Sequence, residues 1–148
     1  MSYHEVEFLK AEAYVRSGNL DDAEAALENA VVAAMSKSNI SLADTAAGYF
    51  EAEVLPRFKS DPLSEVMNQK YIAFFEEEAI EAYCDYRRLE AMGNHVITLE
   101  NPKNSDGLFP HRFTYGNSDV TTNENVRAAY GDGRYVFSEK VWWAGGSR

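Results

Sequence analysis

Apolar residues recur at helical spacing along the first two-thirds of the chain. Residues 2–17 carry one stripe of such positions, and Gly18 follows where a left-handed residue would end a helix. A second helix is expected after a two-residue turn, capped by Asp21 or Asp22. Its apolar positions repeat every three or four residues: Ala23, Ala26, Leu27, Ala30, Val31 and Ala34. The pattern predicts two antiparallel helices joined by a short turn.

A third helix is expected between residues 41 and 55. Ser41 with Asp44 three residues later resembles a capping box, in which Asp replaces the usual Glu. Pro56 lacks a backbone N–H, so we expect the helix to end at about Leu55.

The next helix, or pair of helices, is expected to begin at Asp61-Pro62, an N-cap followed by proline at the first helical position. It extends to about Met92, before the C-cap signal Gly93-Asn94. A broad apolar and aromatic face runs along it: Met67, Tyr71, Phe74, Phe75, Ala79, Ala82, Tyr83 and Tyr86. Such a stripe is typical of a core, and we interpret it so rather than as a ligand site.

Residues 93–148 follow a different pattern. Asn, Asp, Gly and Pro crowd this segment and predict turns, with short strands between them. It nevertheless keeps aromatic residues that a disordered tail would lack: Phe109, Phe113, Tyr115, Tyr130, Tyr135 and Phe137. The chain is therefore predicted to be mainly α, with helices over residues 1–92 and an ordered, loop-rich cap over residues 93–148 wrapped back over them.

Composition excludes several classes of function but says less about the fold. The 148 residues fit one domain or a piece of a larger one, and the net charge of −10 repels phosphate backbones, so we expect no nucleic-acid partner. The single cysteine, Cys84, allows no disulfide within the chain. No stretch is apolar over the roughly 18 residues that a membrane span needs.

Candidate chemistry along the chain is sparse. Glu76–Glu78 are adjacent on a helix and point about 100° apart, so they favour a solvated acidic face over a glycosidase pair. His4, His95 and His111 show no ligand spacing. Residues 117–128 alternate like a calcium loop but lack its glycine and its final glutamate. We predict no catalytic residues, no metal and no cofactor.

Two arginines near a helix C-terminus, Arg87 and Arg88, have two interpretations. Basic side chains there complement the negative end of the helix dipole. Alternatively, one guanidinium forms a buried bidentate pair with a carboxylate and fixes a loop. We favour the second for one of the two, because the preceding helix is so aromatic.

Both tryptophans, Trp142 and Trp143, stand near the end of the chain. Residues 140–143 are predicted to be extended, and side chains of an extended chain alternate between opposite sides. The two rings then form no single flat platform, so we expect at least one to be buried as an anchor for the chain end. On this interpretation Trp143→Ala costs more in folding than in ligand affinity.

Four segments in order resemble one known family: EVEFLKAEAYVRSGNLDDAEAALENAV, QKYIAFFEEEAIEAYCDYRRLEAMG, FPHRFTYGNSDVTTNENV and KVWWAGG. The chain resembles the C-terminal portion of SusD/RagB proteins, within the branch of starch-binding, outer-membrane-associated SusD-like lipoproteins. The first segment also has the small-residue, aromatic and glycine spacing of a tetratricopeptide hairpin. The resemblance covers nearly the whole chain, from Glu5 to Trp143.

This resemblance implies a non-enzymatic protein on the cell surface. It would bind an oligo- or polysaccharide at the outer membrane and pass it to a TonB-dependent transporter. The lipid anchor, the signal peptide and most of the helical scaffold would lie outside this chain. The resemblance fixes no sugar-binding residue, and Tyr115, Tyr135 and Trp143 are only aromatic candidates on loop-like stretches.

An alternative remains open from the helical pattern alone. A tetratricopeptide-like hairpin can serve as a protein–protein interaction module and hold a peptide in a groove between its helices. A further expectation follows from the resemblance. Helix faces that the rest of the parent chain would cover should be exposed here, so the chain should self-associate, bind that remainder or be marginally stable.

Overall fold

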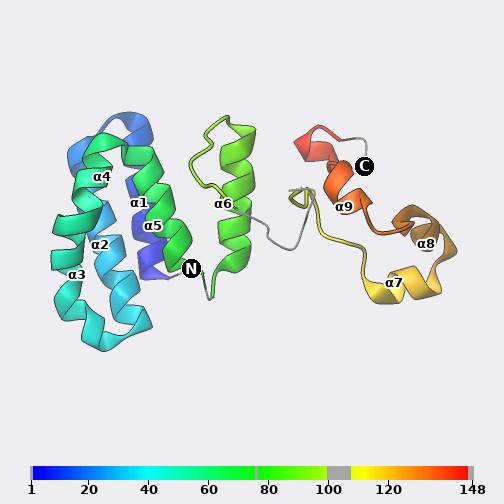
Figure 1. The fold of residues 1–148 in the computed structure, drawn as a ribbon, viewed down its shortest axis with the longest axis horizontal. Coiled ribbons are helices and arrows are strands. Elements are labelled where there is room, and N and C mark those ends of the chain that lie inside the picture. Colours follow the sequence, from blue (N-terminus) through cyan, green and yellow to red (C-terminus); the bar gives the residue numbers. More distant parts are fainter. Residues whose placement is uncertain (1, 76, 100–107, 147–148) are drawn as a thin grey trace. The chain divides into compact units, whose positions relative to one another are not determined.

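The computed structural model describes residues 2–75, 77–99 and 108–146, without the side chain of Trp143. Every regular element within these ranges is helical, and they contain no strand. The chain divides into two compact units, Met1–Thr98 and Leu99–Arg148, called unit 1 and unit 2 below (Figure 1). The expected α class is confirmed, whereas the wrapping of the C-terminal segment over the helices stays a prediction.

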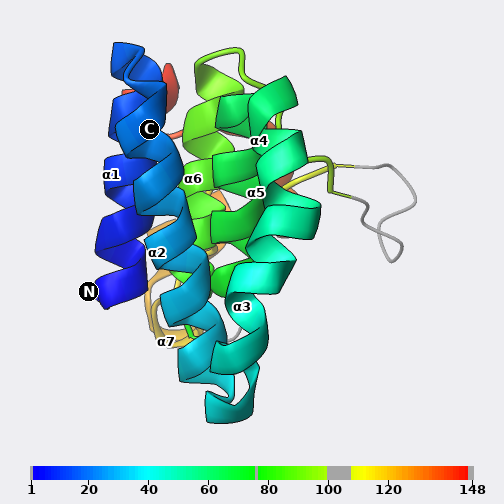
Figure 2. The same cartoon turned by 90° about the vertical axis from the view of Figure 1, so that its left-hand side faces the viewer.

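The elements of unit 1 follow one another with short connections. They are α1 (Tyr3–Ser17), α2 (Leu20–Ser38), η1 (Ile40–Leu42), α3 (Ala43–Tyr49), η2 (Phe50–Val54), α4 (Leu55–Ser60), α5 (Pro62–Ala73) and α6 (Ala79–Ala91). Figure 2 shows α1 and α2 side by side, with α3, α4 and α5 forming the other side of the bundle.

The first two helices form the predicted hairpin. Ser2 caps α1 through a full capping box with Glu5, and Gly18 ends the helix in the left-handed region at φ 80°. The side chain of Asn19, rather than Asp21 or Asp22, accepts the capping hydrogen bond of α2. The prediction of the cap was therefore wrong by two or three residues, because Asn19, directly after the turn glycine, is already placed to accept from the Asp22 N–H.

The stretch after α2 departs most from expectation. Asn39, not Ser41, caps the short η1 turn, and α3 begins at Ala43. Pro56 does not end a helix, since it lies in the first turn of α4. The preceding turn, η2, is a π-helix that ends with the Leu55 N–H donating to the Phe50 carbonyl. That widened turn places the proline where a helix needs no N–H donor, so the chain continues as a helix.

Residues 61–92 form a pair of helices. Asp61 caps α5 as predicted, accepting from the Ser64 N–H with Pro62 at the first position. The helical conformation is interrupted after Phe74 and resumes in α6. That helix ends before Gly93, which has φ 74°. The predicted aromatic face is only partly core: Phe74 is fully buried, whereas Phe75 is 77% exposed.

The core of unit 1 lies between α1, α2, η2, α4 and α5. Small side chains on α1 and α2 let these helices approach closely, and larger ones from both of them and from the neighbouring elements fill the remaining space. Its buried apolar members include Phe8, Ala11, Ala23, Ala26, Leu27, Ala30, Val31, Phe50, Val54, Phe58, Val66, Met67 and Phe74. The rings of Phe8 and Phe74 meet edge to face, with centroids 6.3 Å apart.

Unit 2 is built from short helical turns. They are α7 (Asn117–Thr122), α8 (Glu124–Tyr130), α9 (Tyr135–Ser138) and η3 (Trp142–Ala144). The predicted turns occur around Gly131 and Gly133, but the segment between the turns is helical rather than extended, and Asn123 caps one of its helices. The Asn123 side chain accepts from two N–H groups at the start of α8, and Asp132 accepts from the Arg134 N–H before α9.

Candidate functional site

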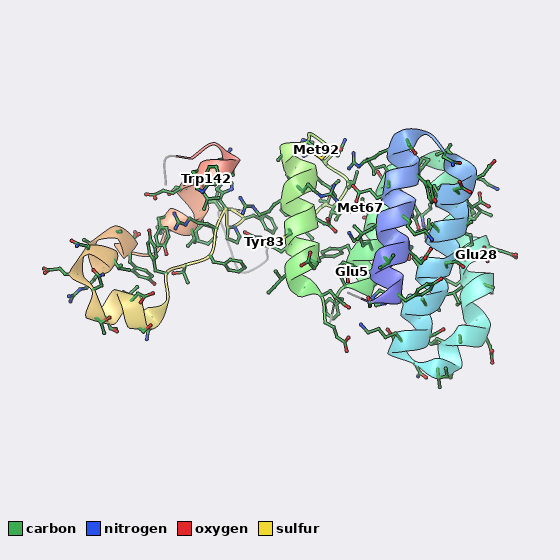
Figure 3. All side chains as sticks on the ribbon, turned by 180° about the vertical axis from the view of Figure 1, so that it is seen from behind. Glu5, Glu28, Met67, Tyr83, Met92 and Trp142 are labelled. Atoms are coloured by element: carbon green, nitrogen blue, oxygen red, sulfur yellow. The ribbon has the colours of Figure 1, made fainter. Side chains whose placement is uncertain are left out.

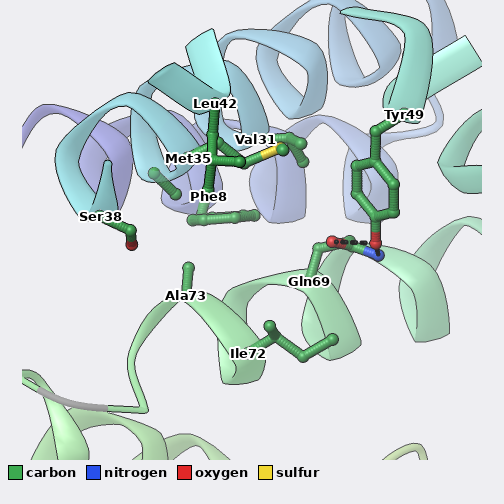
Figure 4. Close-up of a pocket in the computed structure, with 10 residues that line it drawn as sticks. Phe8, Val31, Met35, Ser38, Leu42, Tyr49, Gln69, Ile72 and Ala73 are labelled. Atoms are coloured by element: carbon green, nitrogen blue, oxygen red, sulfur yellow. Dashed lines mark hydrogen bonds between the residues drawn. The ribbon is translucent and has the colours of Figure 1, made fainter. Parts of the chain in front are cut away.

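An apolar groove opens between α1, α2, α3 and α5 in unit 1, with a volume of about 230 Å³ (Figure 4). Its floor and walls are mostly apolar: Phe8, Val31, Ala34, Met35, Leu42, Ile72 and Ala73, with Ser38, Tyr49 and Gln69 at its edges. The Gln69 amide donates to the Tyr49 hydroxyl at 3.1 Å, so these two polar groups bond each other. Because Ile72 is 62% exposed, the groove offers apolar surface to an apolar side chain.

Glu12 lies at the centre of a network of charged side chains between the helices. It is 5% exposed on α1, and both its oxygens accept from Arg88 of α6, at 2.6 and 2.8 Å. Arg16 donates to the same carboxylate at 2.8 Å. Burial raises the pKa of Glu12, but the hydrogen bonds from Arg88 and Arg16 outweigh it and hold the pKa below its usual value.

The network continues from Arg88 to α5. Asp85 accepts from Arg88 at 2.8 Å and pairs with the Lys70 ammonium at 2.6 Å. Lys70 is only 3% exposed, and its ammonium lies 5.3 Å from the centre of the Phe74 ring. The expected bidentate arginine is Arg88, but its side chain is 39% exposed rather than buried, and it links α6 to α1 rather than fixing a loop. The carboxylate partner 76 positions away carries no local sequence signal.

A second polar cluster lies at one end of unit 1, around His4. The imidazole is 2% exposed, meets the Phe74 ring edge to face, and lies 3.7 Å from a Glu78 oxygen. Lys37 at the end of α2 donates to the same glutamate at 3.0 Å and also pairs with Glu77. Burial, with the Lys37 charge, lowers the pKa of His4. Glu77 and Glu78 lie in the connection between α5 and α6 rather than on a helix, and their side chains are 65% and 18% exposed, so the predicted solvated acidic face is only partly formed. Glu76 lies outside the described residues.

Tyrosines form the centre of unit 2, and two of the predicted aromatic candidates are among them. The rings of Tyr115 and Tyr135 stack with centroids 5.3 Å apart, and Tyr130 meets Tyr135 edge to face. The Tyr135 hydroxyl accepts from the Tyr115 N–H at 2.7 Å and donates to Thr114 at 3.0 Å. With Tyr135 only 7% exposed, this pair holds unit 2 together, and its binding of carbohydrate stays a prediction.

Arg112 lies against the same tyrosines. Its guanidinium carbon is 5.3 Å from the ring centres of both Tyr115 and Tyr135. Two of its nitrogens, Nε and Nη1, are buried and have no hydrogen-bond partner in the described part of the chain. We assign the contact to the packing of unit 2, because buried nitrogens are not accessible to a ligand.

The chain end forms a closed turn instead of the predicted extended segment. Residues 142–144 make a 3₁₀ turn, and Gly145 closes it in the left-handed region at φ 85°. Trp142, labelled in Figure 3, is 75% exposed, so it is not the buried anchor. The side chain of Trp143, the third aromatic candidate, lies outside the described residues. The glycine pair after the tryptophans was the signal for a turn.

Charge differs between the two units. Unit 1 has 8 Lys and Arg against 18 Asp and Glu, whereas unit 2 has 6 of each. The net charge of −10 therefore belongs entirely to unit 1. Over the described residues, no three His, Cys, Asp or Glu side chains gather as metal ligands would. No helix within the described ranges is long and apolar enough to cross a membrane.

Comparison with known proteins identifies the family to which the chain is similar. Residues 1–116 match the SusD-like family described as starch-binding and associating with the outer membrane. The whole chain also superposes on a crystal structure of a SusD/RagB family protein from Bacteroides thetaiotaomicron, with a TM-score of 0.82 and 45% sequence identity. The chain spans 35% of that protein's length. A search of curated proteins found no match.

The match extends over both units, and the family consists of non-catalytic binding proteins. Each of the four segments that suggested the resemblance lies within the superposed length, and the first two lie within residues 1–116. The chain therefore belongs to the SusD-like family of starch-binding proteins that associate with the outer membrane.

Proposed function

We propose that the protein is a non-catalytic glycan-binding component of an outer-membrane nutrient importer. The superposition of the whole chain on a SusD/RagB protein at 45% identity carries this proposal. Starch or another α-glucan is the ligand class, in line with the description of the family. A TonB-dependent transporter at the cell surface is the protein partner that receives the glycan.

Within this function, unit 1 serves as a scaffold. Its helices are tied by the ion pairs of Glu12, Asp85 and Arg88, which restrain α6 relative to α1 and α5. This chain spans 35% of the solved relative, so the rest of that relative is nearly twice as long as this chain. We expect a corresponding stretch of polypeptide to be a second partner. Exposed apolar side chains such as Ile72 and Ile80 suit contact with it.

The direct test is glycan binding without hydrolysis. The purified chain is run through native gels containing amylose, with dextran and polygalacturonate as control polysaccharides. We expect retardation by amylose and no release of reducing sugar from it. Equal mobility in all gels would overturn the proposal, and so would accumulation of reducing ends. The proposed transporter partner is tested separately. A TonB-dependent transporter should be recovered with the tagged chain from membranes of a bacterium that produces both.

One observation favours a second candidate, a tetratricopeptide-like module that binds a helix. The apolar groove between α2 and α5 is the kind of concave surface such a module needs. A fluorescent amphipathic peptide of leucine and glutamine is the probe, because it adds no charge that the acidic unit 1 would attract. The module is supported if Ile72→Gln weakens peptide binding and Phe75→Gln leaves it unchanged. Unchanged affinity in both variants excludes the groove.

A further inference from the structure

Trp142 and Phe113 are both presented to solvent in the described part of unit 2, at 75% and 71% exposure, whereas the tyrosines there pack on one another. The exposed fraction of Trp142 is 75%, whereas that of Tyr135 in the same unit is 7%. Within the described residues, Trp142 takes part in no ring stacking and no cation–π contact. An indole is among the largest apolar groups in proteins, so leaving one in water forgoes much of the gain available from burial.

The turn that carries Trp142 is closed by backbone hydrogen bonds. The Val141 carbonyl accepts from both the Ala144 N–H, at 2.9 Å, and the Gly146 N–H, at 3.0 Å. The Gly145 N–H donates to the Trp142 carbonyl at 3.1 Å. The backbone next to the indole is therefore restrained, and little backbone entropy remains to be lost when a ligand binds.

Both glycines of this turn are required by its geometry. Gly145 has φ 85°, which side-chain-bearing residues rarely adopt. A Cβ on Gly146 would collide with the carbonyl oxygen of Lys140. The sequence WWAGG thus specifies a tight turn that displays its first tryptophan, rather than a frayed chain end.

Charge indicates what kind of ligand the indole can receive. Unit 2 has as many basic as acidic residues, and the rest of the chain carries the net charge of −10. An anionic ligand is repelled by that field, while a neutral one is not. A neutral sugar combines hydroxyl groups with an apolar C–H face, and that face can stack on an exposed indole.

We propose that Trp142 is a glycan-contacting residue, stacking on the apolar face of a neutral hexopyranose such as the glucose units of starch. This inference rests on the proposed function. It adds a site beyond the matched residues 1–116, on a turn rather than in the groove of unit 1.

The test titrates maltoheptaose into the chain and follows binding by calorimetry and by tryptophan fluorescence. Trp142→Ala should weaken binding roughly tenfold or more, as loss of a central aromatic contact does. Thermal unfolding should not change, because an exposed side chain contributes little to stability. Phe75→Ala, which removes an aromatic ring that is 77% exposed in unit 1, is the matched control and should leave affinity unchanged.

Trp142→Phe separates the two tryptophans, because it keeps a flat ring and leaves Trp143 as the only indole. It should retain part of the affinity and lose the fluorescence change. Wild-type affinity in Trp142→Ala, or an unchanged fluorescence response in Trp142→Phe, would overturn the inference while the proposed function stands. If the wild-type chain binds no maltoheptaose or amylose, the proposed function falls together with it.

Discussion

Unit 1 and unit 2 stabilise their structures in different ways. In unit 1, long helices bury an apolar core, and buried charged groups such as Glu12 and Lys70 are paired between helices. In unit 2, short helices surround stacked tyrosines, and a phenol hydroxyl bonds the backbone. Net charge is concentrated in the first and balanced in the second.

This difference in charge and packing indicates that the two units would contact a ligand through different kinds of surface. An acidic bundle with ion-paired helices is a rigid support, and its open groove is apolar. The neutral unit carries an exposed indole on a closed turn, and this is the surface on which we propose that a sugar stacks. The predictions below separate the two units by their responses to single substitutions.

The largest effect is expected in the core of unit 1. Phe74→Ala removes a fully buried ring that contacts Phe8 and His4, so it should lower the free energy of unfolding by about 3–5 kcal/mol. Phe75→Ala, at the exposed neighbouring position, should change it by less than about 0.5 kcal/mol. Urea unfolding followed by far-UV circular dichroism measures both. Similar losses in the two variants would contradict the placement of these rings.

Breaking the ion-pair network should cost less. Arg88→Met leaves the buried Glu12 with Arg16 alone and removes one partner of Asp85, so we expect a loss of about 2 kcal/mol. Lys10→Met is the control, because the Lys10 side chain is 46% exposed and pairs with Glu7 within one helix, so its loss should cost less than the loss of Arg88. If the two substitutions have equal effects in urea unfolding, the network does not hold α6 in place.

A smaller effect is expected in unit 2. Tyr135→Phe keeps the stacked ring but removes the acceptor of the Tyr115 N–H and the donor to Thr114, at a cost of about 1 kcal/mol. Hydrogen exchange read by NMR should show faster exchange of the Tyr115 amide. Amides of α1 and α2 should keep their rates; a parallel loss of protection there would show that the two units open together.

The smallest effect is a dependence on pH that arises from His4. The unfolded chain takes up a proton at this residue near pH 6.5, whereas burial lowers the pKa in the folded state. The unfolded state therefore binds more protons as the pH falls below about 6.5, and stability decreases there until the folded-state pKa is passed. His4→Gln should flatten unfolding midpoints measured between pH 7 and pH 5. An unchanged slope would assign the dependence to another group.

Helices with local signals could be predicted from the sequence, and distant partners could not. The stripe of α2, the Asp61-Pro62 start of α5 and Gly18 each specify their own conformation. Pro56 misled because the π-turn before it is a property of the packed bundle. In unit 2, the turn-forming residue Asn123 caps a helix, since Asn serves both purposes.

The candidate sites show the same limit. The preference for a bidentate arginine near residue 88 could be argued from its helix, but its partner Glu12 is remote in sequence. Alternation along an extended chain placed the tryptophans on opposite sides, whereas Gly145 and Gly146 close the chain into a turn that exposes Trp142. The carbohydrate role of Tyr115, Tyr135 and Trp143 stays a prediction.

Hydrogen exchange measured by mass spectrometry, with and without maltoheptaose, tests the central claim most directly. The division into an acidic scaffold and a neutral ligand-contacting unit predicts slower exchange in residues 141–146 when the sugar is present. Residues 31–49 and 65–73, which border the apolar groove, should exchange at unchanged rates. Protection confined to those groove segments, or no protection anywhere in the chain, would contradict this account.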